Sequence, residues 1–208
     1  MMKLRIATGL GLVLFMATMI GGPVRVSQAQ DDGGGITLAS LAGKFSARGN
    51  GFFTLCFSTG FTALQDCATA PIVLPFNNTQ IQNTTRDAAG NTCSVSINTA
   101  APVFGTRSPA LGQRHTNVTT SISFDPTTGS GTASGSQYVG GSCNGAVFDS
   151  TGATKVADFT SSFDVSDSGN RIESILTGFS AVNSAFSVAG SVKGNVFSQT
   201  GIRQHPQD

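Results

Sequence analysis

His115 is the residue best suited to acid–base chemistry, because the other histidine, His205, lies in a polar stretch near the C-terminus. A catalytic histidine is normally held in place by a carboxylate. The neighbour of His115 is instead Arg114, which would lower the histidine's pKa, and no acidic residue lies nearby in the sequence. A carboxylate could still reach it from a distant strand. The sequence favours a surface or strand-end histidine, and we assign no catalytic residue.

A serine nucleophile is often placed on a strained strand-to-helix turn, which the pattern Gly-x-Ser-x-Gly encodes. The nearest approach surrounds Ser142, in Gly-Gly-Ser-Cys-Asn, and it lacks the final glycine. No helical pattern follows it. We expect a turn beside a disulfide bond rather than a nucleophile.

Four oxygen-bearing side chains lie within ten residues and could together bind calcium: Asp164, Asp167, Asn170 and Glu173. Their spacing is not that of an EF-hand, and Asp and Asn also favour turns on their own account. A zinc site would need Cys-x-x-Cys pairs or histidines close to cysteines, and the sequence contains neither. We therefore expect no metal and no cofactor.

The chain contains four cysteines, at positions 56, 67, 93 and 143. In an exported protein they most simply form two disulfide bonds. Their separations favour a short Cys56–Cys67 loop and a long-range Cys93–Cys143 bond. Four cysteines allow three connectivities, so the other two pairings stay open.

Residues 1–29 have the three parts of a secretory signal peptide. Lys3 and Arg5 supply the positive start, and small residues at Ser27 and Ala29 fit a cleavage site. The apolar run between them is about 15 residues long, whereas a membrane-spanning helix needs about 20. We expect cleavage after residue 29, export to the periplasm or beyond the cell, and no membrane span in the mature chain.

The mature chain is nearly neutral. Nine of the twelve basic residues remain after cleavage, against eleven acidic residues, and no basic cluster is present. Binding of nucleic acid or of an anionic membrane surface needs such a cluster, so neither is expected. An outer-membrane barrel would need aromatic girdles, and one Tyr with no Trp argues against it.

Apolar and polar residues alternate through most of the mature chain, after a flexible leader at residues 30–36 and a short turn or one-turn helix at residues 36–41. The alternating runs are residues 45–48, 53–58, 93–97, 118–124, 159–165, 172–176 and 186–190. Such alternation is typical of antiparallel sheet with one wet face. In one run the pattern points Cys93, Val95 and Ile97 inward.

Asp/Gly turn signals at residues 125–129, 149–152 and 167–170 separate these runs. Short connections predict an antiparallel meander, which favours a closed or nearly closed β-barrel, with a β-sandwich as the alternative.

The predicted single domain covers residues 37–200, followed by a polar tail at 201–208. Residues 129–141 read as a weak strand or a loop. Asn77, Asn83 and Asn117 match glycosylation sequons, and we interpret them as polar loop residues.

The opening Leu-Ala-Gly-Lys-Phe at residues 41–45, followed by Gly51-Phe52, resembles the first hairpin of a loose group of exported bacterial proteins. The segments 163–170, 172–177 and 186–190 resemble the last strands of that group. These proteins are similar in architecture to allene oxide cyclase and dirigent-type, calycin-like barrels. The resemblance implies a fold and no site, because the pocket residues of allene oxide cyclase have no counterparts in this sequence.

The sequence is thus consistent with an exported, non-enzymatic β-barrel, either structural or binding a small apolar ligand. An eight-stranded barrel can fill its interior with side chains or hold one ligand. Fourteen phenylalanines remain after cleavage, enough to do either. The alternative is a cyclase- or isomerase-type enzyme working inside the barrel. The sequence leaves the oligomeric state open.

Overall fold

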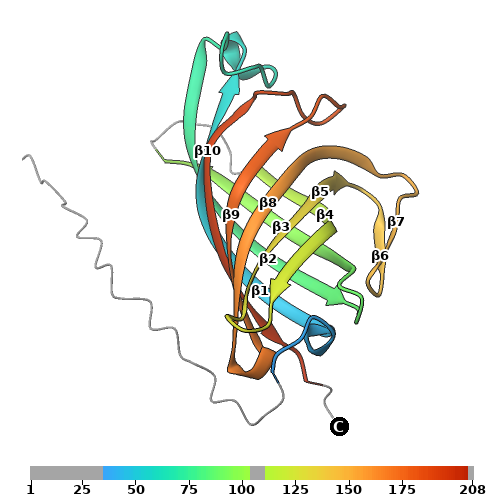
Figure 1. Ribbon diagram of the computed structural model, residues 1–208. Helices are drawn as coiled ribbons and strands as arrows, with labels where there is room; N and C mark the ends of the chain where they lie inside the picture. Colours follow the sequence, from blue (N-terminus) through green and yellow to red (C-terminus); the bar gives the residue numbers. More distant parts are fainter. Residues whose placement is uncertain (1–34, 104–110, 206–208) are drawn as a thin grey trace, which may run out of the picture.

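Eight antiparallel strands close into a barrel in the computed structural model, which describes residues 35–103 and 111–205 (Figure 1). Neighbouring strands follow one another along the chain, and β1 pairs with both β2 and β10 to close the circle. The strands are β1 (Gly43–Phe57), β2 (Ile72–Arg86), β3 (Thr92–Pro102), β4 (Leu111–Asp125), β5 (Ser130–Val139), β8 (Thr154–Ser166), β9 (Arg171–Ala181) and β10 (Val192–Arg203). The predicted all-β meander is confirmed, as a barrel and not a sandwich.

The remaining elements are short. A hairpin of β6 (Ser142–Asn144) and β7 (Val147–Asp149) is inserted between β5 and β8, outside the barrel wall (Figure 1). Three single-turn 3-10 helices are η1 (Ala39–Leu41), η2 (Thr59–Phe61) and η3 (Asp167–Gly169). No helix within residues 35–103 and 111–205 is both long and apolar enough to cross a membrane. The predicted signal peptide and most of the leader lie outside the described residues.

The three predicted turns lie where the sequence puts them. Asp125 shows how: its carboxylate accepts the Thr127 N–H at 2.8 Å, and its carbonyl accepts the Gly129 N–H at 2.9 Å. The second turn connects β7 to β8, and the third is η3 between β8 and β9. These local hydrogen bonds favour a meander because a tight turn places each strand antiparallel to the strand before it.

Four segments, residues 72–86, 111–125, 186–190 and 201–203, differ from the sequence prediction. Residues 72–86 form β2 and residues 111–125 form β4, so Asn77, Asn83 and Asn117 lie on strands and not in loops. Residues 129–141, for which a weak strand and a loop were both open, contain β5, which agrees with the first alternative. Residues 186–190 form a loop, and the last strand is β10. Because β10 runs to Arg203, residues 201–203 belong to the barrel instead of the tail.

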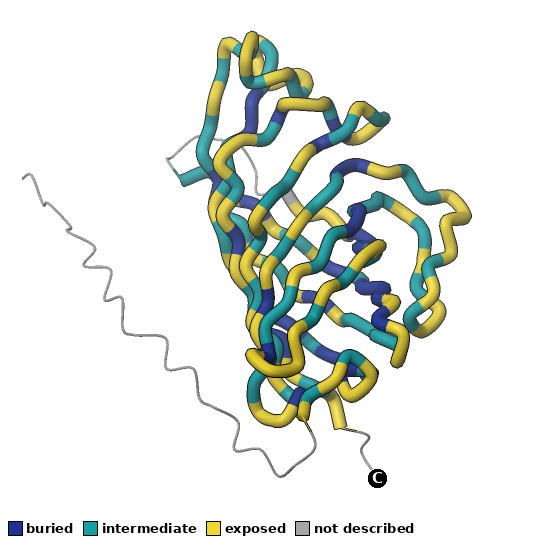
Figure 2. The backbone as a smooth tube through the Cα atoms, in the orientation of Figure 1, coloured by how far each residue is buried: buried dark blue, intermediate teal, exposed yellow. Residues whose placement is uncertain are grey.

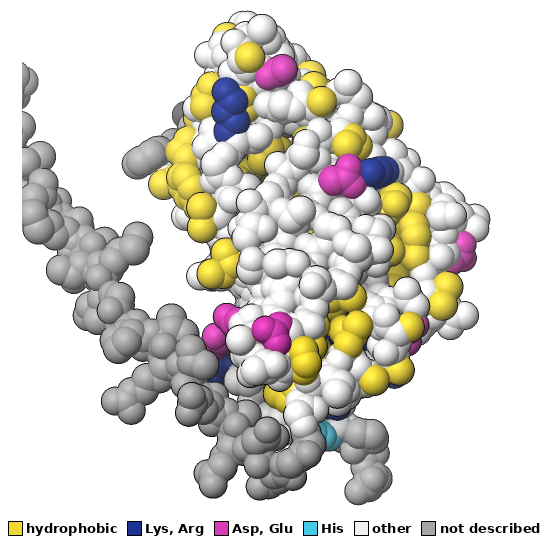
Figure 3. Space-filling view, in the orientation of Figure 1, with side chains coloured by type: hydrophobic (Ala, Val, Ile, Leu, Met, Phe, Trp, Pro, Cys, Tyr) yellow, Lys and Arg dark blue, Asp and Glu magenta, His cyan; other side chains and the backbone are white. Residues whose placement is uncertain are grey.

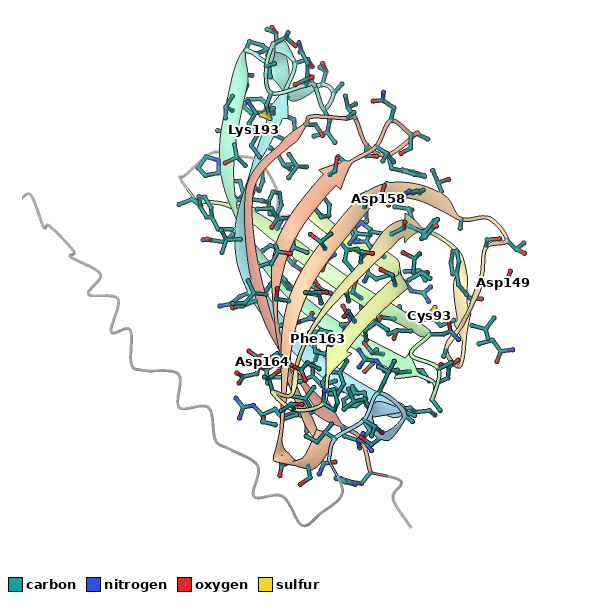
Figure 4. The ribbon with its side chains drawn as sticks, viewed as in Figure 1. Cys93, Asp149, Asp158, Phe163, Asp164 and Lys193 are labelled. Carbon is teal, nitrogen blue, oxygen red and sulfur yellow. A yellow bond between two sulfur atoms is a disulfide. The ribbon has the colours of Figure 1, made fainter. Side chains whose placement is uncertain are left out.

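The direction of β3 is the clearest correction. Ile97 is 59% exposed on the outer face, while Thr92, Ser94 and Ser96 are buried inside. Cys93 is buried too, but outside the wall, where the β6–β7 hairpin covers it (Figure 4). The prediction that Cys93, Val95 and Ile97 point inward was wrong, because it equated the apolar face of every strand with the interior.

A β-bulge lets β4 serve two environments. The register shifts between Thr119 and Ser121, so His115 and Asn117 face inward before the shift and Ile122 faces inward after it. Bulges re-aim side chains in this way by inserting one extra residue. Figure 2 shows buried and exposed positions alternating within the strands of the barrel.

Three inward phenylalanines lie across glycines of the neighbouring strand. The cross-strand pairs are Phe159–Gly135, Phe163–Gly131 and Phe197–Gly51. In each pair the phenyl ring occupies the space that a side chain on the glycine would need; at Gly135 the added Cβ would lie 2.6 Å from the ring. A ring held against its neighbour's backbone covers an otherwise bare stretch of strand and extends less far into the barrel.

One end of the barrel is plugged. Leu41 of η1 is fully buried against Phe163 and Val165, with Ile122 and Phe124 packed around them. The rings of Phe124 and Phe163 stack with centroids 6.1 Å apart. We call this end the floor. It lies at the bottom of Figure 1, with η1 in blue.

Both disulfide bonds have the predicted connectivity, Cys56–Cys67 and Cys93–Cys143. The first closes the η2 loop at the end opposite the floor. The second fastens the β6–β7 hairpin to the outer face of β3. For sequence separations of 11 and 50 residues, chain entropy alone stabilises the fold by about 3 and about 4 kcal/mol.

Replacing Gly135 with alanine should destabilise the barrel by about 1–3 kcal/mol, the usual cost of overpacking. The added methyl would collide with the Phe159 ring and with the backbone carbonyl of Val118. Urea denaturation of the purified, disulfide-bonded protein measures the change. The control is Gly112→Ala on β4, where nothing lies within 4 Å of the added Cβ. Equal stabilities for the two variants would contradict the proposed packing.

Candidate functional site

The barrel encloses a cavity of about 570 Å³. This lies within the range of about 300–1,000 Å³ typical of small-molecule sites. The cavity extends from the floor to the opposite end, where Phe61 and Phe186 line it and are 49% and 51% exposed. Since these two side chains reach solvent, we call that end the mouth.

One wall of the cavity is apolar. It is formed by β1, β8, β9 and β10, with Phe45, Ala47, Phe53, Leu55, Val156, Phe159, Phe163, Ile172, Leu176, Phe179 and Phe197 as its main side chains. Three of these are the phenylalanines held over glycines. Ile172, Ser174 and Leu176, from the alternating run at residues 172–176, all line the cavity on this side.

The opposite wall is polar and comes from β2, β3, β4 and the end of β5. Its side chains include Asn78, Gln80, Gln82, Thr84, Arg86, Thr92, Ser94, Asn98, Gln113, His115, Asn117 and Gln137. They bond mainly to one another: Gln137 donates to Asn117 at 3.0 Å and Asn117 to Ser96 at 3.0 Å. A second chain runs from Gln82 through Thr84 to the Ser94 hydroxyl. These networks satisfy groups whose burial would otherwise be costly.

His115 belongs to this polar wall, contrary to the prediction of a surface or strand-end position. Its side chain is 9% exposed, and its Nδ1 lies 2.7 Å from the amide nitrogen of Asn98. An amide can only donate from that atom, so Nδ1 accepts and Nε2 carries the proton. Burial lowers the pKa of His115 from 6.5 to about 4; desolvation is the cause, in place of the Arg114 charge we expected. His115 is therefore neutral at pH 7 and held by an amide.

Two amide oxygens of the polar wall are buried without a hydrogen-bond donor. They are Oδ1 of Asn78 and Oδ1 of Asn98. Both residues line the cavity, and they lie on neighbouring strands, where Asn78 pairs with Ala100 and Asn98 with Gln80. These acceptors are available to a donor on a bound molecule.

Arg86 stands where the polar wall meets the floor. Its Nε donates to the Thr92 hydroxyl at 3.2 Å, and that hydroxyl donates in turn to the Gly90 carbonyl at 3.0 Å. The guanidinium carbon lies 5.7 Å from the centre of the Phe163 ring, a cation–π distance. In Figure 4 Phe163 lies inside the barrel close to the floor. No Asp or Glu is among the described residues that line the cavity.

The other candidate residues lie apart from the cavity. Ser142 is on β6, in the hairpin outside the wall. Asp164 accepts a hydrogen bond from the Ser130 hydroxyl at 2.7 Å, and Glu173 pairs with Arg171 at 2.5 Å. Within the described ranges, no three His, Cys, Asp or Glu side chains come close enough to bind a metal ion together. The acidic residues on the face in Figure 3 are few and scattered.

Sequence reasoning missed Arg86 and the amide residues of β2. A signal was present, since Asn78, Gln80, Gln82, Thr84 and Arg86 recur with the period of two that a strand imposes. It is weak because, from residue 77 onward, both faces of β2 are largely polar, so no apolar stripe marks this part of the strand.

No protein-family model matches the chain, and neither a curated protein nor a solved structure is similar to it at a significant level. The functional argument therefore rests on the cavity.

The buried His115 should make the protein less stable in mild acid. Because its folded-state pKa is about 4 and its ordinary value 6.5, the unfolded chain binds more protons between these values, and stability falls as pH drops. From pH 7 to pH 5 this amounts to about 2 kcal/mol. Urea denaturation of wild type and His115→Gln at both values measures it. A variant that loses as much stability as wild type would contradict the burial.

Proposed function

We propose that this protein is an exported barrel that binds a small, largely apolar molecule in its interior and does not turn it over. The observation that carries this is the 570 Å³ cavity, bounded on one side by an apolar wall that runs from floor to mouth. Two disulfide bonds fit an oxidising compartment, which agrees with export. The similarity to allene oxide cyclase and dirigent-type barrels stays a prediction about the fold.

Apolar surface facing a cavity favours an apolar ligand, since each Å² removed from water contributes about 25 cal/mol. The phenylalanines over Gly131, Gly135 and Gly51 leave this surface uncovered, because their rings lie along the wall. Phe61 and Phe186 at the mouth are large apolar side chains half exposed to solvent, as expected where such a ligand enters.

Binding is favoured over catalysis by the state of His115. A general base works best with a pKa near the operating pH, and burial holds the pKa of His115 at about 4. Its Nδ1 is already bonded to the Asn98 amide. The polar wall therefore serves to orient a ligand, through acceptors such as Asn78 Oδ1, better than to move its protons.

Filling the cavity should abolish binding. Ser174 lies on β9 between Phe163 and Gln199 of the neighbouring strands and lines the cavity. Its hydroxyl makes no hydrogen bond to the described residues, so Ser174→Phe adds a ring to the interior with little other change. The neutral dye N-phenyl-1-naphthylamine, whose fluorescence rises in apolar surroundings, reports occupancy. We expect its affinity to fall at least about tenfold, or 1.4 kcal/mol.

The matched control is Ile175→Phe on the same strand. Ile175 is 56% exposed on the outer face, so the control adds a similar ring outside the barrel. Its dye affinity should equal that of wild type. Absence of dye binding by wild type, or equal losses in both variants, would contradict an interior site.

A further inference from the structure

Arg86 is a cation without a counter-ion inside the cavity. No carboxylate within residues 35–103 and 111–205 forms a salt bridge with it; the ion pairs there are Lys155–Asp158 and Arg171–Glu173. Its Nη1 is buried with no hydrogen-bond acceptor. Among the described residues, the Thr92 hydroxyl and the Phe163 ring are the groups that contact the guanidinium.

Such an arrangement is costly for the empty protein. Burial of a charge without a partner is unfavourable, and buried charges are normally paired. The cost shows in the pKa of Arg86, which desolvation lowers from its ordinary value. A methionine of similar length would fill the same space beside Phe163 without that cost. A ligand that brings the missing negative charge would offset the free-energy cost of the unpaired guanidinium.

We propose that the ligand is an amphiphile with a single anionic head, a carboxylate, which pairs with Arg86 at the floor while its apolar part lies along the apolar wall toward the mouth. This deepens the proposed function and rests on it. A carboxylate matches the planar fork of an arginine. A doubly charged phosphate is disfavoured because Arg86 is the one cationic side chain among the described lining residues, His115 being neutral.

The depth of Arg86 fixes the orientation of the ligand. Along β2, Arg86 lies eight residues from Asn78, or about 26 Å at 3.3 Å per residue. The head therefore enters first, and an apolar part long enough to fill the cavity ends among Phe53, Phe57 and Phe61 near the mouth. A hydroxyl or amide N–H on that part would reach the free oxygens of Asn78 and Asn98.

Displacement of N-phenyl-1-naphthylamine by decanoate and by decanol tests the proposal, since the two differ only in the head group. For wild type we expect decanoate to displace the dye at a concentration at least tenfold lower than decanol. Arg86→Met should abolish this preference and keep dye binding. High salt should leave it intact in wild type, since buried pairs are screened little.

Arg203→Met is the matched control. Arg203 also packs over a phenylalanine, 5.3 Å from the Phe45 ring centre, and donates to the Ser40 carbonyl, but it does not line the cavity. This variant should keep the preference for decanoate. Far-UV circular dichroism and urea denaturation check folding, and Arg86→Met should be at least as stable as wild type.

The outcomes separate the two claims. Three outcomes overturn the anionic head but leave the apolar site standing, provided that the dye binds wild type. Decanoate and decanol displace the dye equally, neither displaces it, or the preference for decanoate survives in Arg86→Met. Failure of the dye to bind wild type overturns the proposed function itself. Loss of the preference in Arg203→Met as well would assign it to surface charge and overturn the role of Arg86.

Discussion

Phe159 packs across Gly135 from the neighbouring strand, and Phe163 and Phe197 do the same with Gly131 and Gly51. An eight-stranded barrel is narrow enough for inward side chains to fill it. Here the largest inward side chains occupy space that the glycines leave empty. The cavity, the apolar wall and access to Arg86 all depend on this contact, because larger residues at the glycines would drive the rings toward the barrel axis.

The two walls are stabilised differently. The apolar wall depends on burial of aromatic and aliphatic surface, whereas the polar wall depends on amide and hydroxyl networks such as Gln137–Asn117–Ser96. A fully bonded polar network is rigid and specifies one arrangement. Three buried polar atoms of this wall nevertheless have no hydrogen-bond partner among the described residues: Asn78 Oδ1, Asn98 Oδ1 and Arg86 Nη1. All three residues face the cavity, which makes them recognition groups in our proposal.

The strand-rich meander, its turns and both disulfide bonds could be predicted from the sequence, because each depends on local signals or simple separations. Asp125 and Gly129 define a turn without knowledge of the rest of the chain. The direction in which the side chains of β3 point could not be predicted. The alternation of residues such as Ile97 and Ser96 is the same whichever face of the strand points inward. Only closure of the barrel decides that the serine is inside, and the β6–β7 hairpin then buries Cys93 from outside.

The site was harder to predict than the fold for a related reason. His115, Asn98 and Arg86 belong to three different strands, and their placement on one wall of the cavity depends on strand register. The β4 bulge at Thr120 adds a reversal of side-chain direction that no local pattern announces. Sequence reasoning identified His115 as chemically notable but gave it neither its burial nor its amide partner.

A crystal structure of the ligand-free mature protein tests the central claim most directly. Our account predicts the rings of Phe159, Phe163 and Phe197 over Gly135, Gly131 and Gly51, with an open interior that Arg86 faces from the floor. Rings turned toward the barrel axis, with the interior packed by side chains, would contradict it.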